Sequence, residues 1–184
     1  MIVLHLQGKE PMETRLIELR DAETLRTLRI RAVTEYPSAF AASVEEETAL
    51  SIEDIARQLN EGHPYSFWRG VFDQGNLIGV VHLFRYQRPK VCHKTMLGGM
   101  YILPEYRRRG IGRALLEDTI SFARTLEGVE MITLAVTVGN DAARNLYLDT
   151  GFIPFGIEPR YIRVDKTYFD IEWMILDLQR QVQN

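Results

Sequence analysis

Residues 107–112 read Arg107-Arg108-Arg109-Gly110-Ile111-Gly112. They lie between an apolar, strand-like run that ends at 102–104 and an amphipathic helix pattern that begins near Gly112. Glycines let the backbone approach a ligand closely, and the first turn of a helix offers unpaired N–H groups and a positive dipole end to an anion. The six residues therefore predict a phosphate-binding turn. Taken alone, they are explained equally well by a solvent-exposed helix start.

Two other phosphate motifs are absent from the chain. It contains no Gly-x-x-x-x-Gly-Lys-Ser/Thr sequence, and no Gly-x-Gly-x-x-Gly sequence followed by an acidic residue about twenty positions later. These absences exclude a P-loop nucleotide site and a dinucleotide site of the usual type.

A second motif lies downstream. Residues 140–147 read Asn-Asp-Ala-Ala-Arg-Asn-Leu-Tyr, and Gly151-Phe152 follows. Together the two motifs resemble the signatures of the GNAT family of N-acetyltransferases, Arg/Gln-x-x-Gly-x-Gly/Ala and then Asn-x-x-Ala-x-x-Leu-Tyr followed by Gly-Phe. The resemblance extends from a strand-like run at 14–19 to another at 168–178, so it covers nearly the whole chain.

This resemblance implies a single α/β domain of mixed topology. The expected core is a twisted, mostly antiparallel sheet of six to seven strands, flanked by about four helices and splayed at the cofactor site. We expect the N-acetyltransferase domain to comprise residues 12–184, and residues 1–11 to be an N-terminal extension. The chain of 184 residues is long enough for one such core, and no repeat or linker divides it.

The hydrophobic pattern predicts the order of the elements. A strand at 14–19 precedes a helix that follows Asp21, and Ser51 starts a second helix with Asp54 as its capping partner. The remaining elements are expected as strands at 67–72, 77–84 and 96–103, a helix from 111, a strand at 130–138, a helix from 140 and a final strand pair. Gly98-Gly99 inside the strand at 96–103 predicts a bulge or bend.

Composition argues against several classes of protein. A formal net charge of −3 and a pI of about 5.8 argue against a nucleic-acid binder, although the arginines at 107–109 and Arg113 are locally basic. No apolar run approaches the roughly 20 residues that cross a membrane. The single Cys92 excludes an internal disulfide. We expect a cytoplasmic protein without a metal centre.

The resemblance also implies the cofactor, acetyl-CoA as the acyl donor, and the residues that hold it. The strand before the turn is expected to bind the pantetheine arm, and the backbone N–H groups of 108–113 the diphosphate, with Arg107 bracing the turn. Asn140 and Tyr147 lie roughly two helical turns apart, so both can face the cofactor. Tyr147 is the expected catalytic acid, which protonates the leaving thiolate. The expected cofactor-binding residues are Met100, Tyr101, Ile102, Arg107, Arg108, Arg109, Gly110, Ile111, Gly112, Arg113, Asn140 and Tyr147.

The sequence does not identify a general base, because the strand at 96–103 contains no carboxylate. Glu105 suits a solvated ion pair better than catalysis, and ordered water is an alternative proton acceptor. The run Glu45-Glu46-Glu47 either attracts a cationic amine or forms an exposed helix face. No metal or triad pattern includes His82, His93 or Cys92, and covalent catalysis is not expected.

Three functions stay open. The leading one is an acetyl-CoA-dependent N-acetyltransferase that transfers the acetyl group directly to a primary amine, preferably that of a small molecule. The alternatives are a protein N-terminal or lysine acetyltransferase, and a non-catalytic module that senses acyl-CoA. The acceptor's identity does not follow from the fold.

The acceptor side is expected to be formed by the helices near 37–60 and the hairpin near 154–168. Aromatic residues that line an acceptor pocket or belong to the core are Phe40, Tyr65, Trp68, Tyr161 and Tyr168. An exposed sheet edge near the C-terminal strand makes a homodimer a further expectation.

Overall fold

The computed structural model describes residues 2–4 and 12–179. In that part of the chain one sheet has the strand order β1-β2-β3-β4-β5-β6-β8-β7. Neighbouring strands are antiparallel, except for the parallel pair β5 and β6. The strands are β1 (Ile2–Leu4), β2 (Met12–Leu16), β3 (Ser66–Asp73), β4 (Asn76–Arg85), β5 (Lys94–Ile102), β6 (Met131–Thr137), β7 (Ile153–Val164) and β8 (Thr167–Asp177).

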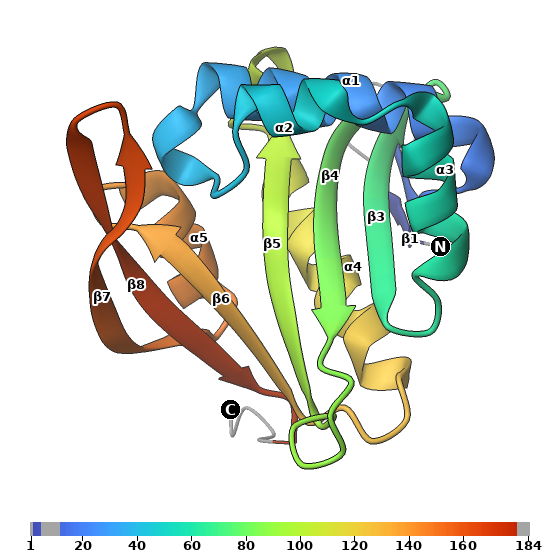
Figure 1. The fold of residues 1–184 in the computed structure, drawn as a ribbon. Helices are drawn as coiled ribbons and strands as arrows, with labels where there is room; N and C mark the ends of the chain where they lie inside the picture. The colour runs from blue at the N-terminus through green and yellow to red at the C-terminus, as the bar shows by residue number, and fades with distance from the viewer. Residues whose placement is uncertain (1, 5–11, 180–184) are drawn as a thin grey trace.

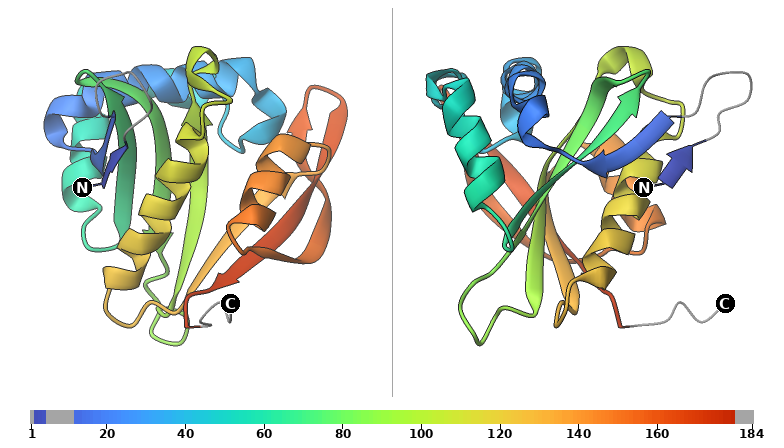
Figure 2. Two further views of the ribbon diagram at one scale, coloured as in Figure 1. Left: turned by 180° about the vertical axis from the view of Figure 1, so that it is seen from behind. Right: turned by 90° about the vertical axis from the view of Figure 1, so that its right-hand side faces the viewer.

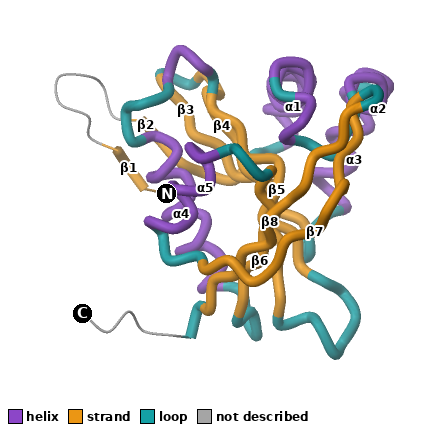
Figure 3. Tube along the Cα trace, turned by 90° about the vertical axis from the view of Figure 1, so that its left-hand side faces the viewer, coloured by secondary structure: helices purple, strands orange, loops and turns teal. Residues whose placement is uncertain are grey.

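Helices cover both faces of this sheet (Figures 1 and 2). Figure 3 shows α1, α2 and α3 on one side of the strands and α4 and α5 on the other. The helices are α1 (Ala22–Glu35), α2 (Val44–Ala49), α3 (Ile52–Glu61), α4 (Ile111–Thr125) and α5 (Asp141–Asp149), and the short 3-10 turns are η1 (Leu19–Asp21), η2 (Pro37–Ala39) and η3 (Pro104–Tyr106).

These features confirm the predicted mixed α/β fold around a mostly antiparallel sheet. Strands β2 to β8 make up the expected seven, and β1 adds three residues by pairing with β2. The described residues contain five α-helices, because residues 44–49 form the short helix α2. The domain start at residue 12 stays a prediction, and residues 5–11 of the expected extension lie outside the described part.

Of the two helix starts predicted before β3, only the one at Ser51 has the expected side-chain cap. Ser51 Oγ accepts a hydrogen bond from Asp54 N at 3.0 Å, and the Asp54 carboxylate accepts one from Ser51 N at 3.0 Å. Asp21 precedes α1, but its carboxylate accepts a hydrogen bond from Arg15 at 2.7 Å and does not cap the helix. The turn around Asp21 ends β2 at Leu16, earlier than the predicted limit.

Two hydrophobic clusters fix the layers relative to the sheet. Leu97 and Leu115 belong to the cluster under α4, whereas Leu25, Ile55 and Val80 belong to the cluster under α1 and α3. Each of these side chains is at most 1% exposed, and such burial stabilises a fold by roughly 1.5–3 kcal/mol per side chain. Helices on both faces are therefore held firmly against β4 and β5.

Strand β5 carries the bulge predicted at Gly98-Gly99. Between the pairs His82–Gly98 and Val80–Tyr101, one residue of β4 faces two residues of β5. Gly99 has a φ of 59°, a conformation that favours glycine. The bulge confirms the expectation and bends β5 at this point.

Strands β5 and β6 separate beyond their first four residues. The parallel ladder joins only 94–97 to 131–134, whereas β5 continues to Ile102 and β6 to Thr137. Figure 1 shows the two strands diverging towards their C-terminal ends. The predicted splay is confirmed, and it leaves the last residues of β5 with an edge that is not paired to β6.

Candidate functional site

The turn after β5 has the geometry of an anion site. Gly110 is the N-cap of α4 with a φ of 76°, and Arg108 is also left-handed with a φ of 58°. A Cβ on Gly110 would meet no atom within 4 Å, so the turn faces open space. The Ala114 N–H donates to Gly110 O at 3.0 Å and so makes the first hydrogen bond of α4. The N–H groups before Ala114 have no partner within the helix. These N–H groups and the helix dipole suit a phosphate.

A pocket of about 480 Å³, here called the cofactor pocket, lies between this turn, the end of β5 and the start of α5. It brings together all but one of the expected cofactor residues. Its lining is Tyr36, Ala39, Phe40, Met100, Tyr101, Ile102, Arg107, Arg108, Gly110, Ile111, Gly112, Arg113, Asn140, Ala142, Ala143, Leu146 and Tyr147. Arg109 is not part of it and lies with its guanidinium 5.6 Å from the Tyr106 ring, so its contact with a cofactor stays a prediction.

Helix α5 presents Asn140 and Tyr147 to the same pocket. Asn140 Oδ1 caps the helix by accepting a hydrogen bond from Ala143 N at 3.3 Å. Tyr147 is 7% exposed, and its hydroxyl lies 3.8 Å from Met100 Sδ, a weak acceptor. Burial raises the pKa of Tyr147 to about 12, so the phenol is protonated at physiological pH. The hydroxyl is thus a proton donor without a strong partner of its own.

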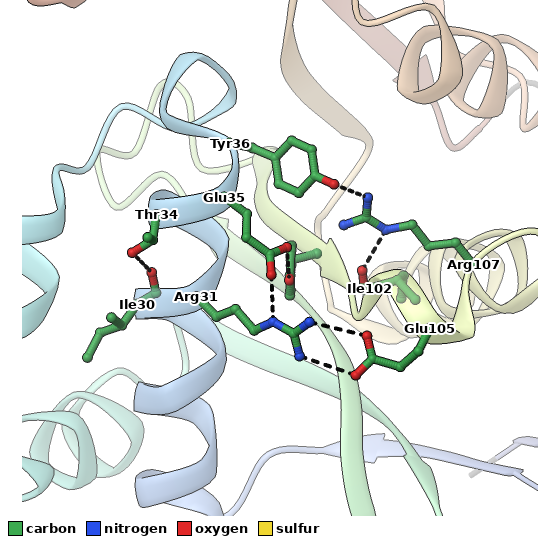
Figure 4. Close-up of polar contacts among 9 residues, drawn as sticks. Ile30, Arg31, Thr34, Glu35, Tyr36, Ile102, Glu105 and Arg107 are labelled. Carbon is green, nitrogen blue, oxygen red and sulfur yellow. Dashed lines mark hydrogen bonds and ion pairs between the residues drawn. The ribbon is translucent and has the colours of Figure 1, made fainter.

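Arg107 joins the end of β5 to the end of α1 (Figure 4). Its Nε donates to Ile102 O at 2.8 Å, and its Nη1 donates to the Tyr36 hydroxyl at 2.6 Å. The guanidinium also lies over the Tyr36 and Tyr101 rings, at 4.7 and 5.4 Å from their centroids. Arg107 therefore ties the turn to the end of β5 and to the residue that follows α1.

A second group of contacts fixes Tyr101. Its hydroxyl donates to Glu35 Oε2 at 2.6 Å, while Arg31 Nε donates to Glu35 Oε1 at 2.7 Å and Arg31 also pairs with Glu105 (Figure 4). Burial, together with the hydrogen bond to Glu35, raises the pKa of Tyr101. The hydrogen bonds from Tyr101 and Arg31 hold the pKa of Glu35 below its usual value of 4.5. The ion pair that was expected for Glu105 is present.

The lowered pKa of Glu35 predicts a pH-dependent contribution to stability. A carboxyl group whose pKa is lower in the folded state stabilises the fold above its unfolded pKa, and this contribution is lost as the pH falls through the folded pKa. We expect Glu35→Gln to lower the free energy of unfolding near pH 7, and the difference from the unaltered protein to shrink progressively below pH 4.5. Urea unfolding of both proteins at neutral and acidic pH measures this difference in the free energy of unfolding. The exposed Glu127→Gln is the control, and an equal deficit at both pH values would contradict the prediction.

A smaller cavity of about 210 Å³ lies on the α1 side of the sheet and is here called the second cavity. Phe40 lines both cavities, and Gly99 of the β5 bulge lines the second one next to Met100 of the first. The Trp68 and His82 rings stack in it with centroids 4.4 Å apart. Burial and the nearby Arg29 lower the pKa of His82 to about 4, so this histidine is neutral at physiological pH.

The acidic and aromatic side chains that the sequence suggested for the acceptor side differ in burial and position. Glu45 and Glu46 are exposed, whereas Glu47 is buried in the second cavity. Tyr161 and Tyr168 are 44% exposed on the β7–β8 hairpin and line neither cavity. Sequence reasoning did not single out Tyr36 or Arg29 for either cavity. Tyr36 was hard to find because it reaches Arg107 from a helix end 71 residues away.

The described residues lack two features. They contain no group of three or more His, Cys, Asp or Glu side chains arranged to hold a metal ion. Over the same residues no helix is both long enough and apolar enough to cross a membrane.

Fold and pocket together define a class of protein: an α/β domain whose sheet splays between two parallel strands, with a glycine-capped helix start at the open end. Residues 27–152, more than half of the chain, match the family model described as the acetyltransferase (GNAT) family. The chain belongs to this family.

Known relatives agree with this placement. N-alpha-acetyltransferase RimI of Mycobacterium tuberculosis is 37% identical over 102 residues, which are 55% of this chain and 61% of RimI. An acetyltransferase of the GNAT family from Streptococcus pneumoniae superposes with a TM-score of 0.83 at 25% identity, over 90% of this chain and 99% of that one. The protein yncA of Salmonella typhimurium, solved with acetyl-CoA as its cofactor, has a TM-score of 0.80 at 17% identity over 94% and 97% of the two chains.

Proposed function

We propose that this protein is an acetyl-CoA-dependent N-acetyltransferase that transfers the acetyl group directly to a primary amine of a small molecule. The observation that carries the proposal is the cofactor pocket, in which the turn at 107–113, the edge of β5 and Tyr147 line one cavity. Each of these groups meets a different requirement of acetyl transfer from a thioester.

The residues of the pocket fit the donor acetyl-CoA. The diphosphate would lie against the backbone N–H groups of 108–113, which the left-handed Gly110 and Arg108 direct towards open space. The pantetheine arm would run back along Met100–Ile102, where β5 has separated from β6. Because the diphosphate would lie beyond Ile102, the thioester would lie near the bulge at Gly99. When bound, the donor supplies an activated acetyl group.

In this proposal Tyr147 supplies the proton for the leaving thiolate. In the proposed reaction the acceptor nitrogen attacks the thioester carbon, an N–C bond forms and the C–S bond breaks. The Tyr147 hydroxyl gives its proton to the departing sulfur, and the acylated nitrogen loses one proton to water. The high pKa of Tyr147 keeps the phenol protonated before the reaction, as a general acid requires. Solvent then restores the phenol proton.

The proposed acceptor is a small molecule because the second cavity, about 210 Å³, is compact and lies next to the bulge. A protein N-terminus is a second candidate, and the match to N-alpha-acetyltransferase RimI favours it. That match spans about three-fifths of RimI, so it supports the class of reaction more than the acceptor.

A screen tests the proposal. Purified protein is incubated with acetyl-CoA and a panel of small primary amines and short peptides, and both free thiol and acetylated product are measured by mass spectrometry. We expect stoichiometric release of coenzyme A with formation of an N-acetyl small amine. Tight binding of acetyl-CoA without transfer to any acceptor would instead indicate a non-catalytic sensor.

A further inference from the structure

The second cavity is lined by one arginine that is held rigidly from three sides. Arg29 Nη2 donates to Glu47 Oε1 at 2.9 Å, and Nη1 donates to Gln58 Oε1 at 3.1 Å. The guanidinium carbon lies 5.1 Å from the Trp68 ring centroid. Helix α1 thus supplies the arginine, while α2, α3 and β3 supply the groups that orient it. A planar guanidinium fixed in this way loses little freedom when it binds a further oxyanion.

The second cavity is lined by one ion pair, Arg29 with Glu47, in which the arginine keeps N–H groups for a further partner. His82 is neutral, so Arg29 is the only charged cation among the described residues that line the cavity. Its partner Glu47 is the more buried member of the ion pair, with side-chain exposures of 14% for the arginine and 8% for the glutamate. Glu47 Oε2 is buried and lies 2.9 Å from Arg29 Nε, so both carboxylate oxygens lie against the guanidinium. Glu47 thus lies against Nε and Nη2, and Gln58 against Nη1, so one N–H on each of Nη1 and Nη2 is left for a further acceptor.

Building on the proposed function, we propose that the second cavity receives the acceptor, and that Arg29 selects primary amines that carry a carboxylate. Phe40 lines both cavities, and the bulge at Gly99 brings the second cavity next to the thioester end of the first. An acceptor anchored by its carboxylate on Arg29 would point its amine towards that junction. A polyamine would instead place a second ammonium group beside the guanidinium, which costs binding energy.

Binding to the protein saturated with free coenzyme A tests this inference apart from catalysis. Three probes share a four-carbon chain and differ in the charge of the far end: 4-aminobutyrate, 4-aminobutyramide and 1,4-diaminobutane. We expect calorimetry to show 4-aminobutyrate binding at least about tenfold more tightly than the other two, as a charge-assisted pair allows. Equal affinities, preference for the diamine, or binding of none of the three would overturn the inference.

Variants of the ion pair test whether Arg29 causes the preference for 4-aminobutyrate. The double variant Arg29→Gln/Glu47→Gln removes both charges of the pair, so it leaves no unpaired buried carboxylate, and it should abolish the preference for 4-aminobutyrate. Glu47→Gln alone should strengthen the preference, because Arg29 loses its competing carboxylate. The exposed Arg57→Gln on α3 is the matched control and should keep the preference. A preference that survives in the double variant would rule out Arg29 as its source.

The same samples separate this inference from the proposed function. If acetyl-CoA binds and a peptide N-terminus is acetylated while none of the three amines binds, the carboxylate selection is wrong and the transferase assignment stands. If neither acetyl-CoA nor free coenzyme A binds, the assignment of the cofactor pocket itself fails.

Discussion

Replacing Gly110 with valine is expected to weaken acetyl-CoA binding by at least about tenfold while leaving the fold intact. Gly110 has a φ of 76°, and a β-branched residue in this conformation is strained by about 1–3 kcal/mol. The protein relieves this strain by moving the turn, which displaces the N–H groups that should hold the diphosphate. Binding of the diphosphate would have to move these N–H groups back, and the strain would then return. If about 1.4 kcal/mol of strain returns, the affinity falls by a factor of ten. Calorimetric titration of the variant measures the loss.

Gly75 offers a matched control for this substitution. It lies in the β3–β4 hairpin with a φ of 81°, and a Cβ there would also meet no atom within 4 Å. Gly75→Val therefore carries a similar backbone strain away from the cofactor pocket. It should lower thermal stability about as much as Gly110→Val and leave the affinity for acetyl-CoA unchanged. Similar losses of affinity in both variants would show that general backbone strain explains the effect, and not the geometry of the turn at 107–113.

Tyr147→Phe is expected to lower turnover by about 100-fold or more with little change in the affinity for acetyl-CoA. General acid catalysis contributes about 10²–10⁴-fold, and the hydroxyl acts only as the sulfur leaves. Because burial raises the pKa of Tyr147 to about 12, deprotonation of this group should not limit the rate at any pH below about 11. Steady-state kinetics with saturating acetyl-CoA measure the change.

Tyr86→Phe controls for the loss of a tyrosine hydroxyl that contacts a methionine sulfur. The Tyr86 hydroxyl lies 3.8 Å from Met96 Sδ, the same kind of contact that Tyr147 makes with Met100, but Tyr86 does not line the cofactor pocket. This variant should keep normal turnover. If Tyr147→Phe also turned over at the normal rate, Tyr147 would have no part in the proton transfer.

Local sequence signals predicted the centre of the fold well. The strand that becomes β5, the glycines at the bulge and the helix start at 110–112 are contiguous, so their geometry depends on short-range backbone preferences. Ser51 and Asp54 form a capping box across three residues for the same reason. Such features depend little on the rest of the molecule.

Side-chain pairs that join distant segments could not be predicted in this way. Arg107 meets Tyr36 across 71 residues, and Tyr101 meets Glu35 across 66 residues. Glu47 belongs to an acidic run that reads as a solvated helix face, and only the packing of α2 against α1 shows that Arg29 pairs with it. The second cavity, which we propose as the acceptor side, is built from such contacts, and this explains why the sequence left the acceptor open.

The measurement that tests the cofactor pocket most directly is calorimetric titration of the protein with acetyl-CoA, with free coenzyme A and ATP as comparison ligands. The turn at 107–113 and the edge of β5 that is not paired to β6 predict micromolar binding of acetyl-CoA. Free coenzyme A should bind more weakly, and ATP, which lacks the pantetheine arm, more weakly still. If acetyl-CoA fails to bind at millimolar concentration, or binds no better than ATP, the pocket does not hold this donor and the proposed acetyl transfer is wrong.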